Sequence, residues 1–279
     1  MMWLINWMSL PSILFRYGVI DTEQELQACK KYFNTYRIRT DIPSGALVIG
    51  RYSVLPFYRE LEMDLANREA TLINSYAQHR WIADFEWYEY VKRFTPESWF
   101  ERDIYKVDYD GPFILKGATN GRKYQWKTHM YAENKKSALD VASRLANDPI
   151  IGQQEIIYRK YIPLRQIDKC EISGLPFVNE WRIFYYKNIL LSYGFYWTGA
   201  QNQDKAYIND KAFVLSQSVA NICANHVNFF VLDVAETATG EWILVEINDG
   251  QMSGLSENNS DALYKNLKRI LNDCSDNRT

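Results

Sequence analysis

The order of apolar and polar positions changes along the chain, and this order predicts its secondary structure. In the first hundred residues, the apolar start MMWLINWMSLPSILF is expected to hold a buried first strand with its connection, and ALVIGRY is expected to form another strand. Each precedes a segment whose apolar residues recur at helical spacing, DTEQELQACKKYF and PFYRELEMDLANRE. Within the first of these segments, Thr22 and Glu25 form a T-x-x-E capping box. We expect RIRT to add a short strand and residues 75–94 to form one long amphipathic helix. This alternation predicts a small α/β unit with a parallel sheet.

A different order of elements begins near residue 100, where we place a domain boundary. Thr95 as a cap and Pro96 at the first helical position predict a helix over TPESWF. Two strands, GPFILKGA and QEIIYRKYI, then flank a helix over NKKSALDVASRLAND. Further on, the pattern predicts a hairpin that turns at Lys187 and Asn188, a helix over NDKAFVLSQSVANICANH and a closing helix over DALYKNLKRIL. Strand runs with single helices predict an α+β domain in two lobes.

An apolar hairpin near the end of the chain, FFVLDVAETATGEWILVEINDG, carries three oxygen-bearing side chains. Side chains alternate between faces along a strand, so Glu246 and Asn248 are expected to share a face with Trp242 and Leu244. A turn centred on ATATGE is expected to place Asp233 opposite Leu244 and diagonal to Glu246. Two carboxylates and an amide suit Mg²⁺ better than Zn²⁺, which would want Cys or His. The alternative is an exposed face whose polar side chains are merely solvated.

A polar loop with several cations follows the strand GPFILKGA. Lys116 ends the strand, Gly117 and Gly121 lie in the loop, and Arg122 and Lys123 follow. Backbone amides and ammonium groups in such a loop can bind a polyphosphate. The spacing matches neither standard glycine-rich phosphate motif, so an ordinary cation-rich surface loop remains the alternative.

Further basic residues fall on predicted strands. Arg159 and Lys160 interrupt the apolar run EIIYRKYI, and Arg182 shares a face with Glu180 in NEWRIFYY. An arginine on a buried strand needs an anionic partner. A phosphate would serve, and so would a structural salt bridge, for example to Glu155 or Glu180, and the pattern leaves both open.

Composition argues against several classes of function. Lys and Arg number 32 against 34 Asp and Glu, so no global field favours nucleic acid or a membrane surface. Four cysteines occur without a C-x-x-C pair, which argues against zinc and fits a reducing cytoplasm. The apolar start MMWLINWMSLPSILF lacks the basic segment and cleavage site of a signal peptide. His79, His129 and His226 have no visible Ser or Cys partner, so no catalytic triad is expected.

Taken in order, Lys116 with its loop, RKYI, NEWRIF, LDV and VEIN resemble the ATP-grasp fold. More narrowly, they resemble the divergent clade that includes the eukaryotic chaperone for assembly of translation initiation factor two. The resemblance covers about residues 44–255. It implies an α+β fold whose two lobes, at about residues 104–160 and 161–279, sandwich a nucleotide. A small α/β domain over residues 1–100 would precede the ATP-grasp domain over residues 101–279.

The resemblance also implies roles for individual residues. ATP would lie between the lobes, with its phosphates in contact with Lys116, Arg122, Lys123, Arg159 and Arg182. The backbone of Lys160, Tyr161 and Ile162 would meet the adenine edge. Mg²⁺ would be held by Asp233, Glu246 and Asn248, while Lys116 and Arg182 would stabilise charge on the transferred phosphoryl group. No residue downstream of these matches an acceptor site.

Enzymes of this fold typically transfer the γ-phosphoryl group of ATP to a carboxylate, and an amine or thiol then attacks the acylphosphate. The resemblance therefore implies an ATP- and Mg²⁺-dependent carboxylate-amine ligase, whose unknown acceptor could be a protein or peptide, and the cysteine pattern places it in the cytoplasm. Two alternatives stay open: a nucleotide-binding assembly chaperone that grips a protein partner, and a phosphotransferase that stops at the phosphorylated acceptor.

Overall fold

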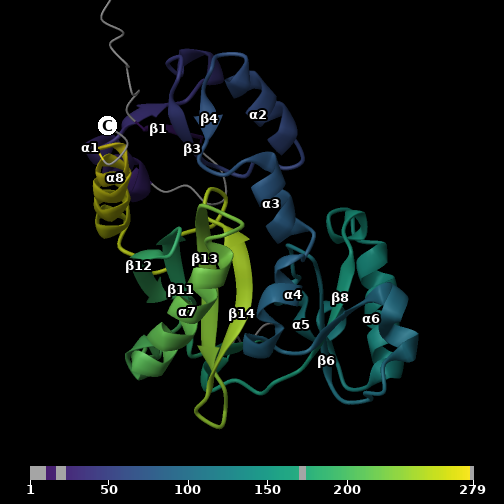
Figure 1. Ribbon diagram of the computed structural model, residues 1–279. Helices are drawn as coiled ribbons and strands as arrows, with labels where there is room; N and C mark the ends of the chain where they lie inside the picture. Colours follow the sequence, from purple (N-terminus) through teal and green to yellow (C-terminus); the bar gives the residue numbers. More distant parts are fainter. Residues whose placement is uncertain (1–10, 17–22, 170–173, 277–279) are drawn as a thin grey trace, which may run out of the picture.

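The computed structural model describes residues 11–16, 23–169 and 174–276, and the protein has three parts (Figure 1). An N-terminal unit is built on the sheet β2-β1-β3-β4. A first lobe is built on the sheet β5-β8-β6-β7, and a second lobe on the sheet β12-β11-β13-β14. The two lobes lie next to each other, and the N-terminal unit lies at one end of the second lobe.

The N-terminal unit has a parallel sheet, as the alternating pattern predicted. Its elements are β1 (Ser12–Phe15), α1 (Glu23–Tyr32), β2 (Asn34–Tyr36), β3 (Leu47–Arg51), α2 (Tyr58–Ala66) and β4 (Thr71–Leu72). RIRT does not join this sheet, because the strand ends at Tyr36 and a 3-10 helix over Arg39–Asp41 follows. Ile38 is 57% exposed there, so no burial holds the segment in a strand. Residues 1–10 and Thr22 of the expected capping box lie outside the described residues.

Two helices, α3 (Tyr76–Ala83) and α4 (Trp87–Val91), connect the N-terminal unit to the first lobe. The sequence predicted one helix here, and that prediction was wrong. Phe85 has a φ of 64°, a left-handed conformation that interrupts the helical path. The break allows Phe85 and Trp87 to pack in the core of the second lobe, where both are buried.

The first lobe has an antiparallel sheet covered by one helix. Its elements are β5 (Ser98–Phe100), β6 (Phe113–Gly117), α5 (Trp126–His129), β7 (Tyr131–Ala132), α6 (Lys135–Ala146) and β8 (Ile156–Lys160). Asn134 caps α6 by accepting a hydrogen bond from the amide of Ser137. The predicted helix over TPESWF is wrong, because β5 pairs with β8. The Thr95 hydroxyl donates to the carbonyl oxygen of Leu244 at 2.8 Å rather than capping a helix.

The second lobe has an antiparallel sheet, and the predicted hairpins and helices are confirmed. Its elements are β11 (Glu180–Tyr186), β12 (Ile189–Phe195), α7 (Asp210–Cys223), β13 (Phe229–Glu236), β14 (Trp242–Asp249) and α8 (Ser260–Asp276). A separate small hairpin pairs β9 (Gln166–Lys169) with β10 (Pro176–Val178).

The two faces of the second-lobe sheet are covered by different elements. On one face, Ile183 and Leu232 pack against α7, α3 and α4. On the other, Phe184 and Val231 pack against α8 and α1. Farther along this second face, β11 carries Glu180 and Arg182, which line a cavity on the side of the first lobe. One sheet face therefore carries buried apolar side chains at one end and the polar side chains of the cavity at the other.

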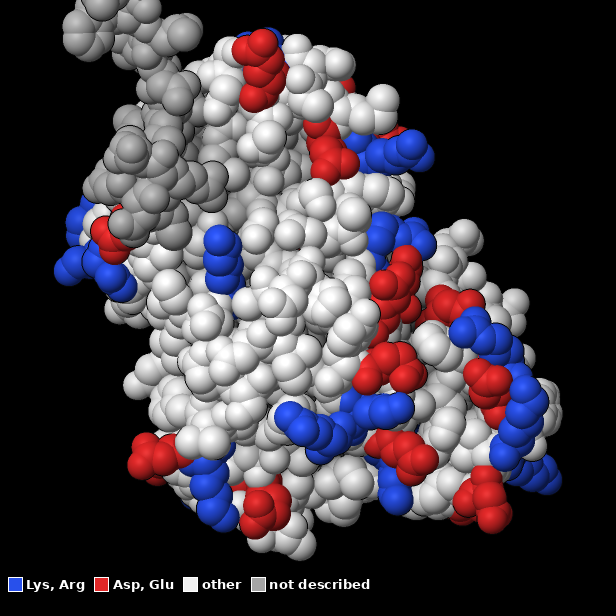
Figure 2. Space-filling view, in the orientation of Figure 1, with Lys and Arg blue, Asp and Glu red and all other residues white. Residues whose placement is uncertain are grey.

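Charged side chains of both signs are mixed on the face shown in Figure 2, most densely over the first lobe. The surface over the second lobe carries fewer of them in this view. Within the described ranges, no helix combines the length and apolar character needed to cross a bilayer.

Candidate active site

A cavity of ≈ 410 Å³ lies between the two lobes. The first lobe contributes the ends of β6 and β8 and the loop after β6, and the second contributes β11, β14 and the loop after β14. Among the described residues, five basic side chains line the cavity against two carboxylates: Lys116, Lys123, Arg159, Lys160 and Arg182 against Glu180 and Glu246. This size suits a small-molecule ligand, and the excess positive charge suits a polyanion.

A β-bulge in β14 decides which side chains of the hairpin reach the cavity. Asp233 pairs with Glu246, whereas Val234 pairs with Leu244, so Val245 is the extra residue. The expected register, with Asp233 opposite Leu244, is therefore wrong. Because the bulge shifts the alternation, Leu244 is buried in the core of the second lobe, and Val245, Glu246 and Asn248 line the cavity. Asp233, Glu246 and Asn248 nevertheless share one face, as the sequence predicted.

Arg182 and Asp233 form a buried bidentate ion pair beneath the cavity. The Nε of Arg182 donates to Oδ1 of Asp233 at 2.9 Å, and Nη2 donates to Oδ2 at 2.8 Å. Burial opposes the charged guanidinium, but the Asp233 carboxylate raises the pKa of Arg182. The partner of Arg182 is thus a structural carboxylate, and it is neither Glu155 nor Glu180. Nη1 of Arg182 also donates to the carbonyl oxygen of Gly254 at 2.9 Å.

Lys116 and Glu246 bring the two lobes into contact across the cavity. The Lys116 ammonium donates to Oε1 of Glu246, and both side chains are largely buried, with 11% and 15% exposed. Burial and the nearby charges of Arg159 and Lys123 lower the pKa of Lys116. The Nδ2 of Asn248 donates to Oδ2 of Asp233 at 3.3 Å. The end of β6 therefore faces the three oxygen-bearing side chains of the hairpin.

Arg159 is a buried cation for which the described residues supply no ion pair within 4.0 Å. Its Nε donates to the Ser98 hydroxyl at 3.1 Å, and Nη1 donates to the carbonyl oxygen of Val245. Its Nη2 is buried without a hydrogen-bond partner. Burial lowers the pKa of Arg159 to about 10. A guanidinium in this state, on the wall of a cavity, favours an anionic ligand.

The loop after β6 brings only one of its two adjacent cations to the cavity. Lys123 lies over the Tyr196 and Trp197 rings of the second lobe, 4.1 Å and 5.1 Å from their centroids. Arg122 instead forms a bidentate pair with Asp148, at 2.6 Å and 2.5 Å, and does not line the cavity. We therefore do not include Arg122 among the residues proposed to bind a nucleotide.

The segment Lys160, Tyr161 and Ile162 lines the cavity where the chain passes from the first lobe to the second. The Lys160 amide donates to the carbonyl oxygen of Glu97 at 2.8 Å, and the Tyr161 amide donates to that of Pro112 at 2.9 Å. The amide of Ile162 has no hydrogen bond to another described residue. It is therefore the backbone donor of this segment that remains for a ligand.

Glu180 is buried at the cavity wall, two positions before Arg182. Burial raises its pKa to about 7, and the charge of Lys123 opposes that rise. Sequence reasoning noted its face but gave it no ligand role. Tyr196, Ser253 and Gly254 also line the cavity and were missed, because a tyrosine after a strand and a small-residue loop carry no distinctive pattern.

Replacing Glu180 with glutamine (Glu180→Gln) should remove a pH dependence of stability. The carboxyl has a pKa of about 7 in the folded protein and an ordinary value of 4.5, so the folded state binds more protons between these pH values. Stability is therefore lost as pH rises through this window, by on the order of 3 kcal/mol in the wild type. Urea unfolding from pH 4.5 to 8 should show this fall in the wild type and not in Glu180→Gln. Parallel profiles for the two proteins would contradict it, and the exposed Glu155→Gln serves as control.

The hairpin donors Glu246 and Asn248 fit Mg²⁺ in chemical type, and Asp233 lies behind them. Among the described residues, no group of three His, Cys, Asp or Glu side chains could hold a metal ion, so a carboxylate-rich or zinc-type cage is not present there. Two carboxylates and an amide match a cation that keeps waters and binds substrate phosphates. Asp233 is fully buried beneath the cavity, and its two oxygens accept hydrogen bonds from Arg182 and Asn248, so Glu246 and Asn248 are the hairpin donors that line the cavity. Asn248 turns its Nδ2 toward Asp233, which leaves its Oδ1 for another partner.

Residues 103–267 match the model of a protein family that is described as an ATP-grasp domain, family 3 of one clade of such domains. This match covers more than half of the chain, so the chain belongs to that ATP-grasp family. A search of curated proteins finds no match. The family match confirms the resemblance to the ATP-grasp fold that the ordered motifs predicted.

Solved structures share this fold at low sequence identity. D-cycloserine synthetase DcsG is 12% identical with a TM-score of 0.58, and the alignment covers 94% of this chain and 99% of DcsG. The ATP-grasp ligase PsnB, complexed with a minimal precursor, is 11% identical with a TM-score of 0.57, covering 95% and 99%. D-alanyl-alanine synthetase A from Vibrio cholerae is 11% identical with a TM-score of 0.54, covering 97% and 98%. Identities this low show the fold alone.

Proposed function

We propose, from the membership of this chain in the ATP-grasp family that matches residues 103–267, that it is an ATP- and Mg²⁺-dependent ligase. It would join a carboxylate to an amine or a similar nucleophile. The observation that carries the proposal is the buried Arg159 guanidinium, which stands on the cavity wall with Nη2 unpaired. A nucleotide phosphate would supply the missing anion. Similar folds in D-cycloserine synthetase DcsG and in the ATP-grasp ligase PsnB support the same reaction class.

We place the nucleotide between the first lobe, about residues 104–160, and the second, about 161–279. Its phosphates would meet Lys116, Lys123, Arg159 and Arg182, and its base would lie against Lys160, Tyr161 and Ile162. The small α/β domain, residues 1–100, would precede this ATP-grasp domain. Among the described residues that line the cavity, Pro96 precedes residue 101, and the others belong to the two lobes.

The reaction would proceed in two transfers. An oxygen of the acceptor carboxylate attacks the γ-phosphorus, the bond from that phosphorus to the β,γ-bridging oxygen breaks, and ADP leaves. The amine then attacks the carbonyl carbon of the acylphosphate, a C–N bond forms, the C–O bond to phosphate breaks, and the amine loses its proton to solvent. Lys116 and Arg182 would hold the transferring group in place and balance its charge. Mg²⁺, when held by Glu246 and Asn248 with the buried Asp233 behind them, would neutralise phosphate charge.

Mg-ATP should raise the melting temperature of the wild-type protein. A ligand at 100 times its dissociation constant stabilises by about 2.7 kcal/mol, which corresponds to roughly 5–10 °C for a chain of this size. ADP formation should then depend on an added carboxylate and amine. No melting shift would count against nucleotide binding altogether.

The acceptor panel separates the ligase from its alternatives. ADP release with a joined product supports the ligase, and ADP at background across carboxylates, peptides and amines contradicts it. A stable phosphorylated acceptor would instead identify a phosphotransferase. A stoichiometric protein partner that is captured only with ATP would identify a chaperone.

A further inference from the structure

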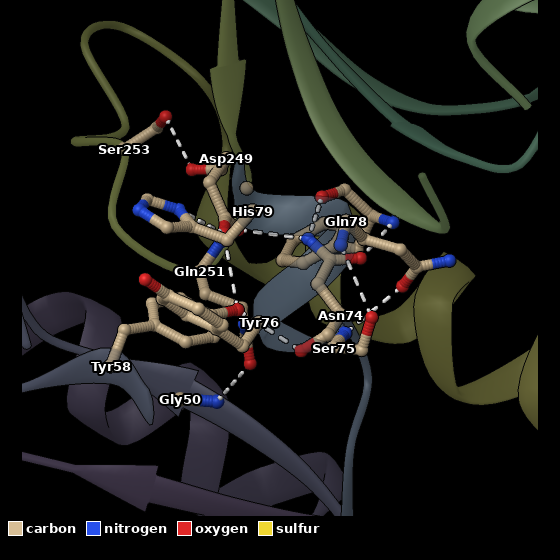
Figure 3. Close-up of polar contacts among 12 residues, drawn as sticks. Gly50, Tyr58, Asn74, Ser75, Tyr76, Gln78, His79, Asp249, Gln251 and Ser253 are labelled. Carbon is tan, nitrogen blue, oxygen red and sulfur yellow. Dashed lines mark hydrogen bonds and ion pairs between the residues drawn. The ribbon is translucent and has the colours of Figure 1, made fainter. Parts of the chain in front are cut away.

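One wall of the cavity is formed by the loop that follows β14, residues 250–254, which we call the 250–254 loop. Met252, Ser253 and Gly254 line the cavity. The loop follows Asn248 by two residues, so its position is coupled to that of the oxygen-bearing hairpin. Its hydrogen bonds, however, run largely to the N-terminal unit (Figure 3).

Arg51, the last residue of β3, holds the backbone of this loop. Its Nη1 donates to the carbonyl oxygen of Gly250 and, at 3.2 Å, to that of Gln251. Its Nη2 donates to the carbonyl oxygen of Ser253 at 2.8 Å. Glu25 of α1 pairs with the same guanidinium, at 2.9 Å to Nε and 2.7 Å to Nη2. Arg51 and Glu25 are each 1% exposed, so this guanidinium is committed to the loop and to Glu25.

Asp249, at the end of β14, is held by a second set of contacts (Figure 3). Its Oδ1 accepts from Nδ2 of Asn74 at 2.9 Å, and its Oδ2 accepts from the Tyr58 hydroxyl at 3.2 Å. Nδ1 of His79 lies 3.2 Å from the same Oδ2. These three residues come from α2, α3 and the segment between them. The N-terminal unit and its connecting helix therefore fix the residue next to Asn248 as well as the loop.

These contacts set the direction in which the loop presents its amides. In a trans peptide the C=O and N–H groups point in opposite directions. Since the Ser253 carbonyl points to Arg51, the Gly254 amide points away from Arg51, and Ser253 and Gly254 both line the cavity. That amide has no hydrogen bond to another described residue. The carbonyl of Gly254 accepts from Arg182, so two arginines bind neighbouring carbonyl groups of the loop.

We propose that Arg51 is a positioning residue: by binding three carbonyl groups of the 250–254 loop it fixes this wall of the cavity and turns the Gly254 amide toward an anionic oxygen of the bound substrates. The inference rests on the proposed function, because it assumes that substrates occupy this cavity. Arg51 itself does not line the cavity. The N-terminal unit would thus control substrate binding through the loop without touching the nucleotide.

The test uses Arg51→Lys and the double variant Glu25→Gln/Arg51→Met. Lysine keeps the charge, but its compact ammonium group cannot replace the planar guanidinium that donates to several carbonyl groups and to Glu25 at once. The double variant removes both charges together, which avoids a buried unpaired carboxylate that could unfold the chain. Leu26→Ala is the control, because Leu26 is a buried core residue of α1 that makes no contact of this kind with the loop.

Hydrogen-deuterium exchange should rise roughly tenfold in the peptide over residues 250–257 in both Arg51 variants, the equivalent of losing one charge-assisted hydrogen bond. The affinity for the non-hydrolysable analogue AMPPNP should fall by a similar factor, because the Gly254 amide would no longer be held toward an anionic oxygen of the ligand. Leu26→Ala should lower the melting temperature without either change.

If the hydrogen-deuterium exchange rate of residues 250–257 in both Arg51 variants equals that of the wild type, the inference is overturned. An equal rise in Leu26→Ala would also overturn it, because Arg51 would then act only through general stability. A wild-type protein that fails to bind AMPPNP would count against the proposed function, and the exchange measurement would still decide whether Arg51 holds the loop.

Discussion

Replacing Asp233 with alanine (Asp233→Ala) is expected to lower the free energy of unfolding by about 3–5 kcal/mol, the largest stability change that we predict for the site. The side chain of Asp233 is fully buried and accepts two hydrogen bonds from Arg182, itself 8% exposed. Removing the carboxylate leaves a buried guanidinium without its counter-ion. Urea unfolding with linear extrapolation measures the effect.

Two controls bracket this prediction. The double variant Asp233→Leu/Arg182→Met removes both charges and should recover much of the loss, since an apolar pair can replace a buried ion pair. Glu241→Ala breaks the exposed pair of Lys211 and Glu241, 3.5 Å apart, and should cost less than about 1 kcal/mol. A loss below about 1 kcal/mol in Asp233→Ala would show that the pair is not an essential part of the fold.

Lys116→Ala and Glu246→Ala should each abolish most of the melting-temperature rise caused by Mg-ATP. Lys116 is the cation at the end of β6, and Glu246 is the carboxylate of the hairpin that lines the cavity opposite it. Each would make a charged contact to the nucleotide or its metal, and the loss of one such contact costs about 1.5–3 kcal/mol, or roughly 10- to 100-fold in affinity. The shift is compared with each variant's own ligand-free melting temperature, because the two side chains also bind each other.

Arg122→Ala is the matched control for these variants. It removes a cation from the same loop, but one that is paired with Asp148 and lies outside the cavity lining. It should respond to Mg-ATP as the wild type does, and isothermal titration with AMPPNP should give an unchanged dissociation constant. A wild-type response in Lys116→Ala and Glu246→Ala would place the nucleotide elsewhere.

Local pattern was sufficient for most elements of the fold. The strands that carry Lys116 and Arg182 were predicted from apolar runs, and α6 and α7 from helical spacing. The failures occurred where tertiary packing overrode a local signal. Phe85 is held at a positive φ because its ring is needed in the second-lobe core, and the segment TPESWF pairs with β8 although its first two residues resemble a helix start.

The sequence by itself determined that Glu246 and Asn248 share a face, because the alternation of a strand is a local steric property, whereas Asp233 joins that face through its pairing with Glu246 on the neighbouring strand. Only the tertiary structure decided how they are arranged. The bulge at Val245 sets Glu246 opposite Asp233 and sends Leu244 into the core. Likewise, Arg182 pairs with Asp233 on a neighbouring strand, and Arg51 reaches the 250–254 loop from 199 residues away. Such choices depend on which segments pack together, and the local spacing of residue types does not encode that.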